Sequence, residues 1–133
     1  MLYLDSSAVY KLIADELESR PLTAFLAGQS APVSSTLARV EVGRALGRAQ
    51  GRPWRAGHAD DVLSRICLLA LDDSILARAA GIGPPELRSL DAIHLATALS
   101  VPALEGMVVY DRRLARAAQA AGLRVWAPGR ESG

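Results

Sequence analysis

Residues 1–12 read M-L-Y-L-D-S-S-A-V-Y-K-L, and this opening stretch raises the question that decides the fold. The apolar run Leu2–Leu4 has the composition of a short buried strand. It leads directly into the acid Asp5 and two serines, after which the apolar residues take helical spacing. Either Asp5 caps the helix that follows, or it marks a functional site at the end of the strand.

The same alternation of strand and helix continues along the whole chain. Four later apolar runs are typical of short strands, and segments with helical spacing or capping residues separate them. The predicted strands are 2–4, 32–34, 67–71, 107–110 and 123–126. The predicted helices are 7–14, 21–28, 37–50, a segment ending near 65, a segment capped at 72–74 and ending at 80, 91–100 and 114–121. This order favours an α/β fold with a mainly parallel sheet.

The composition favours one globular domain spanning residues 1–133, with the last six or so residues, from Pro128 onward, as a flexible tail. Half of the residues are hydrophobic and 22% are charged, whereas aromatics reach only 5%, so platforms for stacking nucleic-acid bases are not indicated. The single cysteine, Cys67, excludes a disulfide framework and a thiolate zinc site, and we expect it in the core. No signal peptide or bilayer-length apolar run is visible, so we expect a soluble, cytoplasmic protein with no membrane partner.

Two acids follow predicted strands in matching contexts, Asp5 after L-Y-L and Asp111 after M-V-V-Y. Ligands of open parallel sheets bind outside the carboxyl ends of the strands, so both acids are expected at one crevice. Two further acids, Glu41 and Asp91, lie on predicted helices among apolar residues. Four acids in one crevice would repel one another unless a cation neutralised them. Mg²⁺ and Mn²⁺ prefer such oxygen ligands, and a site of this kind suits phosphodiester hydrolysis.

Each acid also has a purely structural interpretation. Asp5, Asp91 and Asp111 all stand where a carboxylate caps a helix, which is worth about 1 kcal/mol each. Glu41 is three residues before Arg44, a spacing that allows an ion pair on an exposed helix face. Spacing alone does not decide between these interpretations and a common site.

Four segments together resemble the PIN domain, and specifically the VapC-type toxins of bacterial toxin–antitoxin pairs. They are L-Y-L-D-S-S-A at 2–8, S-S-T-L-A-R-V-E-V at 34–42, R-S-L-D-A-I-H-L-A-T-A-L at 88–99 and V-V-Y-D-R-R-L-A-R-A-A at 108–118. Each motif is weak alone, but their order, spacing and the total length all fit, so the resemblance covers essentially the whole chain.

The resemblance implies a three-layer α/β/α sandwich with a five-stranded, mainly parallel sheet. It implies a toxin that cuts RNA endonucleolytically, with Mg²⁺ or Mn²⁺ held by Asp5, Glu41, Asp91 and Asp111. Ser6 takes the position of a small hydroxyl residue that often helps to orient the metal site. The implied partners are the RNA substrate, a small antitoxin whose C-terminal part fills the groove, and a second copy of the chain in a homodimer.

The sequence departs from the family pattern around the fourth acid. Many relatives carry Thr or Ser two positions before it, where this chain has Val109, and some add another acid directly after it, where this chain has Arg112. A hydroxyl group that could orient Asp111 is therefore absent from that position. The departures concern the number of metal ions and the role of Asp111, and they leave the first three acids unaffected.

Two residues beside the acids have open interpretations. His94 follows Asp91 by three residues, and on an apolar helix we interpret it as a packed histidine rather than a general base. Arg44 could contact the RNA backbone or an antitoxin carboxylate, or lie on a solvated helix face.

Two functions compete with the nuclease. A phosphatase that works through an aspartyl-phosphate is disfavoured, because Ser6-Ser7 follows Asp5 where that chemistry needs a second acid, and the only lysine, Lys11, lies on the first helix. A non-catalytic binding module, whose acids cap helices or dock a basic partner, remains open, and it predicts no affinity for metal.

Overall fold

The structure, a computed structural model, describes residues 1–49 and 56–130 of the chain. Its sheet has five strands in the order β3-β2-β1-β4-β5, and every pair of neighbours is parallel. The strands are β1 (Leu2–Leu4), β2 (Val33–Ser35), β3 (Cys67–Leu69), β4 (Gly106–Val108) and β5 (Arg124–Trp126). The five predicted strands are thus all present, although four of them are shorter or shifted by a residue or two. The predicted helix break at 51–53 lies outside the described residues.

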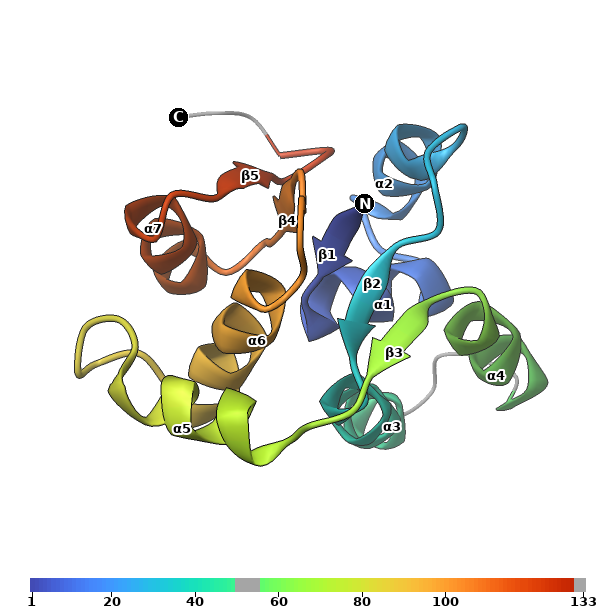
Figure 1. Cartoon of the computed structure of the whole chain (residues 1–133). Helices are drawn as coiled ribbons and strands as arrows, with labels where there is room; N and C mark the ends of the chain where they lie inside the picture. Colours follow the sequence, from blue (N-terminus) through green and yellow to red (C-terminus); the bar gives the residue numbers. More distant parts are fainter. Residues whose placement is uncertain (50–55, 131–133) are drawn as a thin grey trace.

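Helices cover both faces of this sheet and give a three-layer α/β/α sandwich (Figure 1). The helices on one face are α1 (Ser6–Ile13), α2 (Ser19–Leu26), α3 (Leu37–Arg48) and α4 (Ala56–Ser64). The helices on the other face are α5 (Asp73–Gly81), α6 (Ser89–Leu99) and α7 (Arg112–Ala120). None of the helices in the described ranges has both the length and the apolar character needed to cross a membrane.

The central strand β1 supplies side chains to both layers of core. Leu2 and Leu4 pack with α1 to α4, whereas Tyr3, which points the other way, packs with α6 and α7. Successive side chains of a strand point to opposite faces, so a strand covered on both faces is apolar throughout. This is why a continuous apolar run, rather than an alternating one, precedes Asp5.

The pairing of β1 with β4 brings two of the four acids to the same edge of the sheet. Leu4 lies in register with Val108, so each strand ends at the same level. The backbone N–H of Asp5 donates to the Val108 carbonyl at 3.3 Å, and Asp111 follows three residues beyond Val108. The expectation that both acids stand at the carboxyl edge of a parallel sheet is therefore confirmed.

The prediction of a buried Cys67 is wrong. Cys67 is the first residue of β3, and its side chain is exposed. β3 is an edge strand, so it has a neighbour on one side only and its residues are less covered than those of β1. An apolar run in the sequence does not distinguish an edge strand from a central one.

Part of the expected flexible tail makes specific contacts. The Tyr110 hydroxyl donates to the carbonyl of Pro128 at 2.8 Å, and the Arg130 guanidinium donates to the carbonyl of Tyr110. Arg130 also lies over the Tyr110 ring, 5.3 Å from its centroid. Residues 131–133 are outside the described part of the chain.

Candidate active site

Asp5 is held by the start of α1 and is almost completely buried, with 4% of its surface exposed. Its Oδ1 accepts hydrogen bonds from the Ala8 backbone N–H at 3.0 Å and from the Ser7 hydroxyl at 2.8 Å. Asp5 therefore does cap α1, as the structural interpretation predicts. Burial nevertheless raises the pKa of Asp5 to about 6, against the opposing effect of these two hydrogen bonds. A cap needs no burial of this kind, since Asp72 caps α5 through the same type of hydrogen bond although its side chain is exposed.

Glu41 lies on α3 and turns toward the sheet edge rather than toward solvent. Its Oε1 lies 2.6 Å from His94 Nε2 and also accepts a hydrogen bond from the Ser6 hydroxyl. Burial alone would raise the pKa of Glu41, but these hydrogen bonds, with the charge of Arg88, outweigh it and hold the pKa below its usual value. Arg44 is exposed on α3 and, within the described residues, makes no ion pair with any of the four acids. An ion pair with Arg44 therefore does not explain why an acid stands at position 41.

Asp91 and Asp111 share one cation, Arg88, which stands at the N-terminus of α6. Arg88 Nε lies 3.2 Å from Asp91 Oδ2, and Arg88 Nη2 lies 3.4 Å from Asp111 Oδ2. Asp111 also caps α7, because its Oδ1 accepts from the Leu114 backbone N–H at 3.0 Å. Asp91 caps nothing; it lies in the first turn of α6, whose N-cap position is Arg88.

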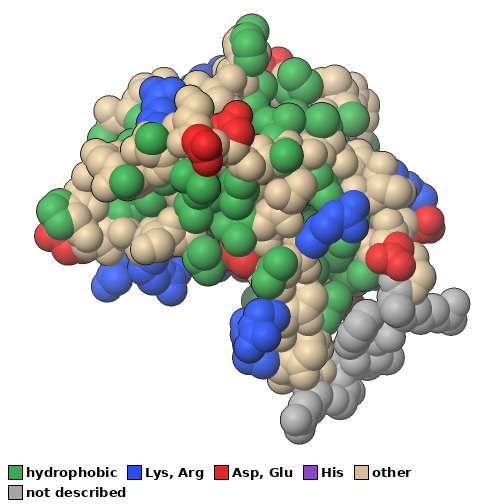
Figure 2. Space-filling view, turned by 60° about the horizontal axis from the view of Figure 1, so that its bottom comes forward, with side chains coloured by type: hydrophobic (Ala, Val, Ile, Leu, Met, Phe, Trp, Pro, Cys, Tyr) green, Lys and Arg blue, Asp and Glu red, His purple; other side chains and the backbone are tan. Residues whose placement is uncertain are grey.

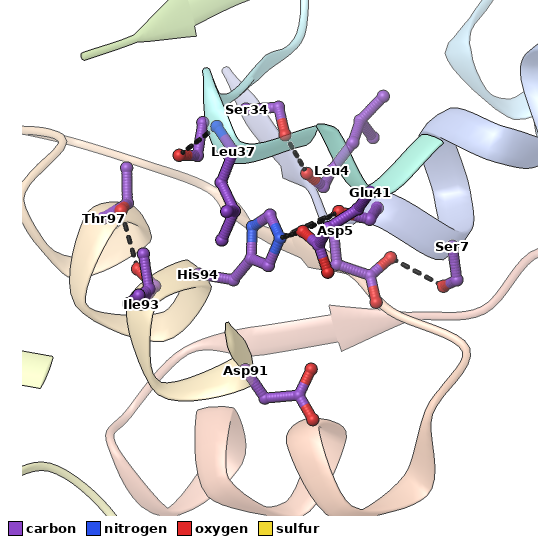
Figure 3. A network of polar contacts seen from close by, with 12 residues as sticks. Leu4, Asp5, Ser7, Ser34, Leu37, Glu41, Asp91, Ile93, His94 and Thr97 are labelled. Atoms are coloured by element: carbon purple, nitrogen blue, oxygen red, sulfur yellow. Dashed lines mark hydrogen bonds and ion pairs between the residues drawn. The ribbon is translucent and has the colours of Figure 1, made fainter. Parts of the chain in front are cut away.

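The carboxylates of the three aspartates form one electrostatic unit. Burial raises the pKa of Asp91; Arg88 acts in the opposite direction without cancelling this effect, and the charge of Asp111 adds to it. The charge of Asp91 in turn contributes to the raised pKa of Asp5. Figure 3 shows Asp5 and Glu41 beside His94, with Asp91 below them on α6. The structure thus places in one region the four acids that the sequence singled out, with Arg88 and His94 between them: Asp5 directly after β1, Glu41 on α3, Asp91 on α6 and Asp111 three residues after β4.

Asp5 and Glu41 are each anchored to the protein through one of their two oxygens. Asp5 uses Oδ1 and Glu41 uses Oε1, whereas Asp5 Oδ2 and Glu41 Oε2 make no hydrogen bond to any of the described residues. Among the described residues, the only partner of the Oδ2 atoms of Asp91 and Asp111 is the exposed side chain of Arg88. Anchored carboxylates with a second, available oxygen are the arrangement in which proteins hold hard divalent cations.

This donor set fits Mg²⁺ or Mn²⁺. The candidate ligand atoms are all carboxylate oxygens, which both ions prefer. Burial, with a smaller contribution from the charge of a neighbouring aspartate, raises the pKa values of Asp5 and Asp91, and a bound cation would favour their ionised forms. Within residues 1–49 and 56–130, no three acidic, histidine or cysteine side chains lie together in a group that could hold a metal ion. Mg²⁺ does not require such a group, since it is usually bound through one or two carboxylates, several waters and phosphate oxygens of the substrate.

The sequence predicts no polar role for two residues of the site, His94 and Arg88. His94 is buried, as predicted for a packed histidine, but it also contacts Glu41 and Ser6. Arg88 received no role, although its position three residues before Asp91 allows a pair on one helical turn. The hydrogen bond from His94 to Glu41 joins residues 53 positions apart, and local spacing carries no signal for it.

The face that surrounds the acids is of mixed charge. Figure 2 brings the carboxyl end of the sheet forward and shows acidic side chains interspersed with exposed cationic side chains, which are arginines because the only lysine, Lys11, is buried. Fold and site together define an α/β/α protein with an acidic centre at the carboxyl edge of a parallel sheet.

Comparison with known proteins identifies the family that has this architecture. The family model of the PIN domain matches residues 2–120, so the chain belongs to the PIN-domain family. Ribonuclease VapC46 of Mycobacterium tuberculosis strain H37Rv is 44% identical over 128 residues, which cover 96% of this chain and 97% of the relative. Ribonuclease VapC35 of the same strain is 43% identical, and Ribonuclease VapC47 of strain CDC 1551 is 38% identical, each over 97% of this chain and 98% of the relative. The predicted resemblance and the predicted fold class are both confirmed.

Proposed function

We propose that this chain is a metal-dependent endoribonuclease that acts as the toxin of a toxin–antitoxin pair. The observation that carries the proposal is the group of four acids from four separate elements, three of them coupled electrostatically around the buried Asp5. Similarity over almost the whole length to proteins named as ribonucleases of the VapC group supports it. The substrate is accordingly RNA, and the bond that breaks is a phosphodiester.

In the proposed site Asp5, Glu41, Asp91 and Asp111 hold a divalent cation, Mg²⁺ or Mn²⁺. The bound ion supplies a water of lowered pKa and stabilises negative charge on the phosphoryl oxygens. The protein's own contribution is to fix its ligands: Ala8 and Ser7 hold Asp5, while Ser6 and His94 hold Glu41. Without the cation, the clustered negative charge would repel an RNA phosphate.

The competing function is a non-catalytic binding module whose acids serve the helices. The capping contacts of Asp5 and Asp111 favour it, because they show that both residues already have a structural task. This module would have no affinity for metal, and its melting temperature would not respond to Mg²⁺ or Mn²⁺. A nuclease site, in contrast, is stabilised by the ion that it binds in the native state alone.

The proposal is tested with antitoxin-free protein and total RNA in the presence of Mg²⁺, Mn²⁺ or EDTA. We expect discrete RNA fragments with either metal and none with EDTA, together with a rise in melting temperature on adding Mn²⁺. At a Mn²⁺ concentration of 100 times Kd this stabilisation amounts to about 2.7 kcal/mol. A protein that cuts no RNA and melts at the same temperature with and without Mn²⁺ would instead be the binding module.

The proposal extends to two protein partners, a small antitoxin and a second copy of the chain. The VapC-type resemblance supports both, and the exposed Arg44 is a candidate contact for an antitoxin carboxylate or for the RNA backbone. Co-expression with the product of the neighbouring gene, followed by light scattering on the purified complex, measures the stoichiometry. A monomer that co-purifies with no small protein would contradict this part of the proposal.

Removing Arg88 should tighten metal binding. Arg88 pairs with one oxygen each of Asp91 and Asp111, so it competes with a cation for the same carboxylates. Because exposed ion pairs contribute about 0.2–1 kcal/mol, we expect Arg88→Gln to lower the Kd for Mn²⁺ by roughly 1.5- to 5-fold for each pair that competes. Calorimetric titration measures this change, and Arg78→Gln, an exposed arginine at the end of α5, is the matched control. Weaker binding by Arg88→Gln would mean that Arg88 supports the ion rather than competing with it.

A further inference from the structure

The buried histidine of α6 is connected to three other elements of the site. His94 has 1% of its surface exposed, and both of its ring nitrogens have polar partners. Nε2 lies 2.6 Å from Glu41 Oε1 and 2.9 Å from the Ser6 hydroxyl, and Nδ1 lies 2.7 Å from the Tyr3 hydroxyl. Figure 3 shows the imidazole placed between α6 and the Glu41 carboxylate. Packing of an apolar helix does not require polar partners on both ring nitrogens, so these contacts need a further explanation.

The chemistry of these partners fixes the direction of the hydrogen bonds. Glu41 Oε1 lies 2.6 Å from His94 Nε2, and a carboxylate oxygen can only accept a hydrogen bond. His94 Nε2 must therefore carry a proton and donate it to Glu41 Oε1. In a neutral imidazole Nδ1 then accepts, and the Tyr3 hydroxyl, which lies 2.7 Å away, can donate to it. A chain of donors thus runs from Tyr3 through His94 to Glu41.

We infer that His94 is a positioning residue of the metal site, which holds Oε1 of Glu41 through its Nε2–H and leaves Oε2 available to the cation. The inference rests on the proposed function, because it assigns the held carboxylate to that cation. Ser6 donates to the same oxygen, so Glu41 is fixed from two sides. Tyr3 in turn fixes the tautomer and the ring orientation of His94 from the core. Groups that orient a metal ligand in this way typically affect metal affinity 10- to 100-fold.

The inference is tested by calorimetric titration of metal-free protein with Mn²⁺. We expect His94→Leu, which fills the volume but cannot donate, to raise the Kd about 10- to 100-fold. His94→Gln keeps an N–H donor within reach of Glu41 and should remain close to wild type. Tyr3→Phe removes only the hydroxyl, and we expect it to fall between these two. His58→Leu is the matched control, because His58 is the other of the two histidines of the chain and is exposed on α4.

A second measurement does not depend on any variant or on metal. Nitrogen-15 spectra of the histidine ring in the metal-free wild-type protein report which nitrogen carries a proton, and we expect a protonated Nε2 for His94. A tautomer protonated only at Nδ1 would overturn the inference, because Nε2 could then not donate to Glu41.

The outcomes separate this inference from the proposed function. If wild-type protein binds Mn²⁺ and cuts RNA while His94→Leu binds Mn²⁺ equally well, His94 only packs α6 and the inference fails alone. A lower melting temperature of His94→Leu with unchanged Mn²⁺ affinity has the same meaning. If wild-type protein neither binds Mn²⁺ nor cuts RNA, the proposed function fails and the assignment of His94 fails with it.

Discussion

Asp5→Asn should abolish metal-dependent RNA cleavage while leaving the fold intact. The substitution removes the negative charge from the most buried of the four acids, whose remaining oxygen is available to the cation. Asn can still cap α1, because its side-chain carbonyl accepts from the Ala8 backbone N–H as the carboxylate does. We expect cleavage of a fluorescent RNA with Mn²⁺ to fall at least about a thousandfold, which corresponds to about 4 kcal/mol of lost transition-state stabilisation.

The same substitution should stabilise the metal-free protein at neutral pH. The pKa of Asp5 is about 6 in the native protein and near 3.8 when unfolded, so between these values the native state binds more protons. Wild-type stability therefore falls as pH rises from about 4 to about 6, and the loss is complete above that range. Asp5→Asn carries no such charge and should be more stable than wild type by roughly 1–3 kcal/mol at pH 7.5, and by almost nothing at pH 4. Denaturant unfolding in EDTA at both pH values measures the difference.

Asp72→Asn is the matched control for this substitution. Asp72 caps α5 in the same way that Asp5 caps α1, with its Oδ1 accepting from the Ile75 backbone N–H at 2.8 Å, but Asp72 is exposed. If the cap were the whole task of Asp5, the two variants would behave alike and both would cut RNA at the wild-type rate. Wild-type cleavage by Asp5→Asn would remove Asp5 from the proposed site.

The opening stretch of the chain was enough to predict the centre of the fold. An apolar run that is buried on both faces and then ends in a carboxylate is what a central parallel strand produces, and β1 is that strand. The sequence was less informative about the margin of the sheet. Cys67 lies in an equally apolar run, but its strand has only one neighbour, and exposure there depends on tertiary neighbours that no local pattern specifies.

Some contacts of the candidate site could likewise be predicted from local sequence, whereas others depend on long-range packing. Asp5 and Asp111 were predictable as neighbours because parallel strands end at one edge. Glu41 and Asp91 lie on helices, and their approach depends on how α3 and α6 pack onto opposite faces of the sheet. The sequence pattern gives the apolar stripe of each helix but not the angle at which the helix lies. The contact between His94 and Glu41 is a product of that packing, so it could only be seen in the structure.

The structural and functional interpretations of the acids turn out to be compatible for two of the four. Asp5 and Asp111 each give one oxygen to a helix N-terminus and keep the other away from the backbone. A capping contact therefore does not argue against a metal site. In the proposed site this contact would orient the metal ligand, because the backbone N–H groups fix the carboxylate at the level where the strand ends.

Asp91 provides the sharpest test between the two interpretations, because it caps nothing. Its only contribution to α6 beyond the ion pair with Arg88 is a negative charge in the first turn, which is worth about 0.3–1 kcal/mol. Asp73 also lies in the first turn of its helix, as the first residue of α5, and is exposed. If both acids serve only their helices, Asp91→Asn and Asp73→Asn should lower stability by similar small amounts and leave everything else unchanged.

The proposed site predicts instead that the two variants differ by orders of magnitude in activity. Asp91→Asn should reduce Mn²⁺-dependent cleavage at least about a thousandfold and abolish the rise in melting temperature with Mn²⁺, whereas Asp73→Asn should match wild type in both. Asp111→Asn should lie between them, because Asp111 is more exposed than Asp91, at 34% against 15% of the side chain, and its charge is more screened by water. Parallel cleavage assays and melts with and without Mn²⁺ measure all three variants. Equal activity of Asp91→Asn and Asp73→Asn would mean that Asp91 only stabilises α6 and is not a ligand of the proposed metal site.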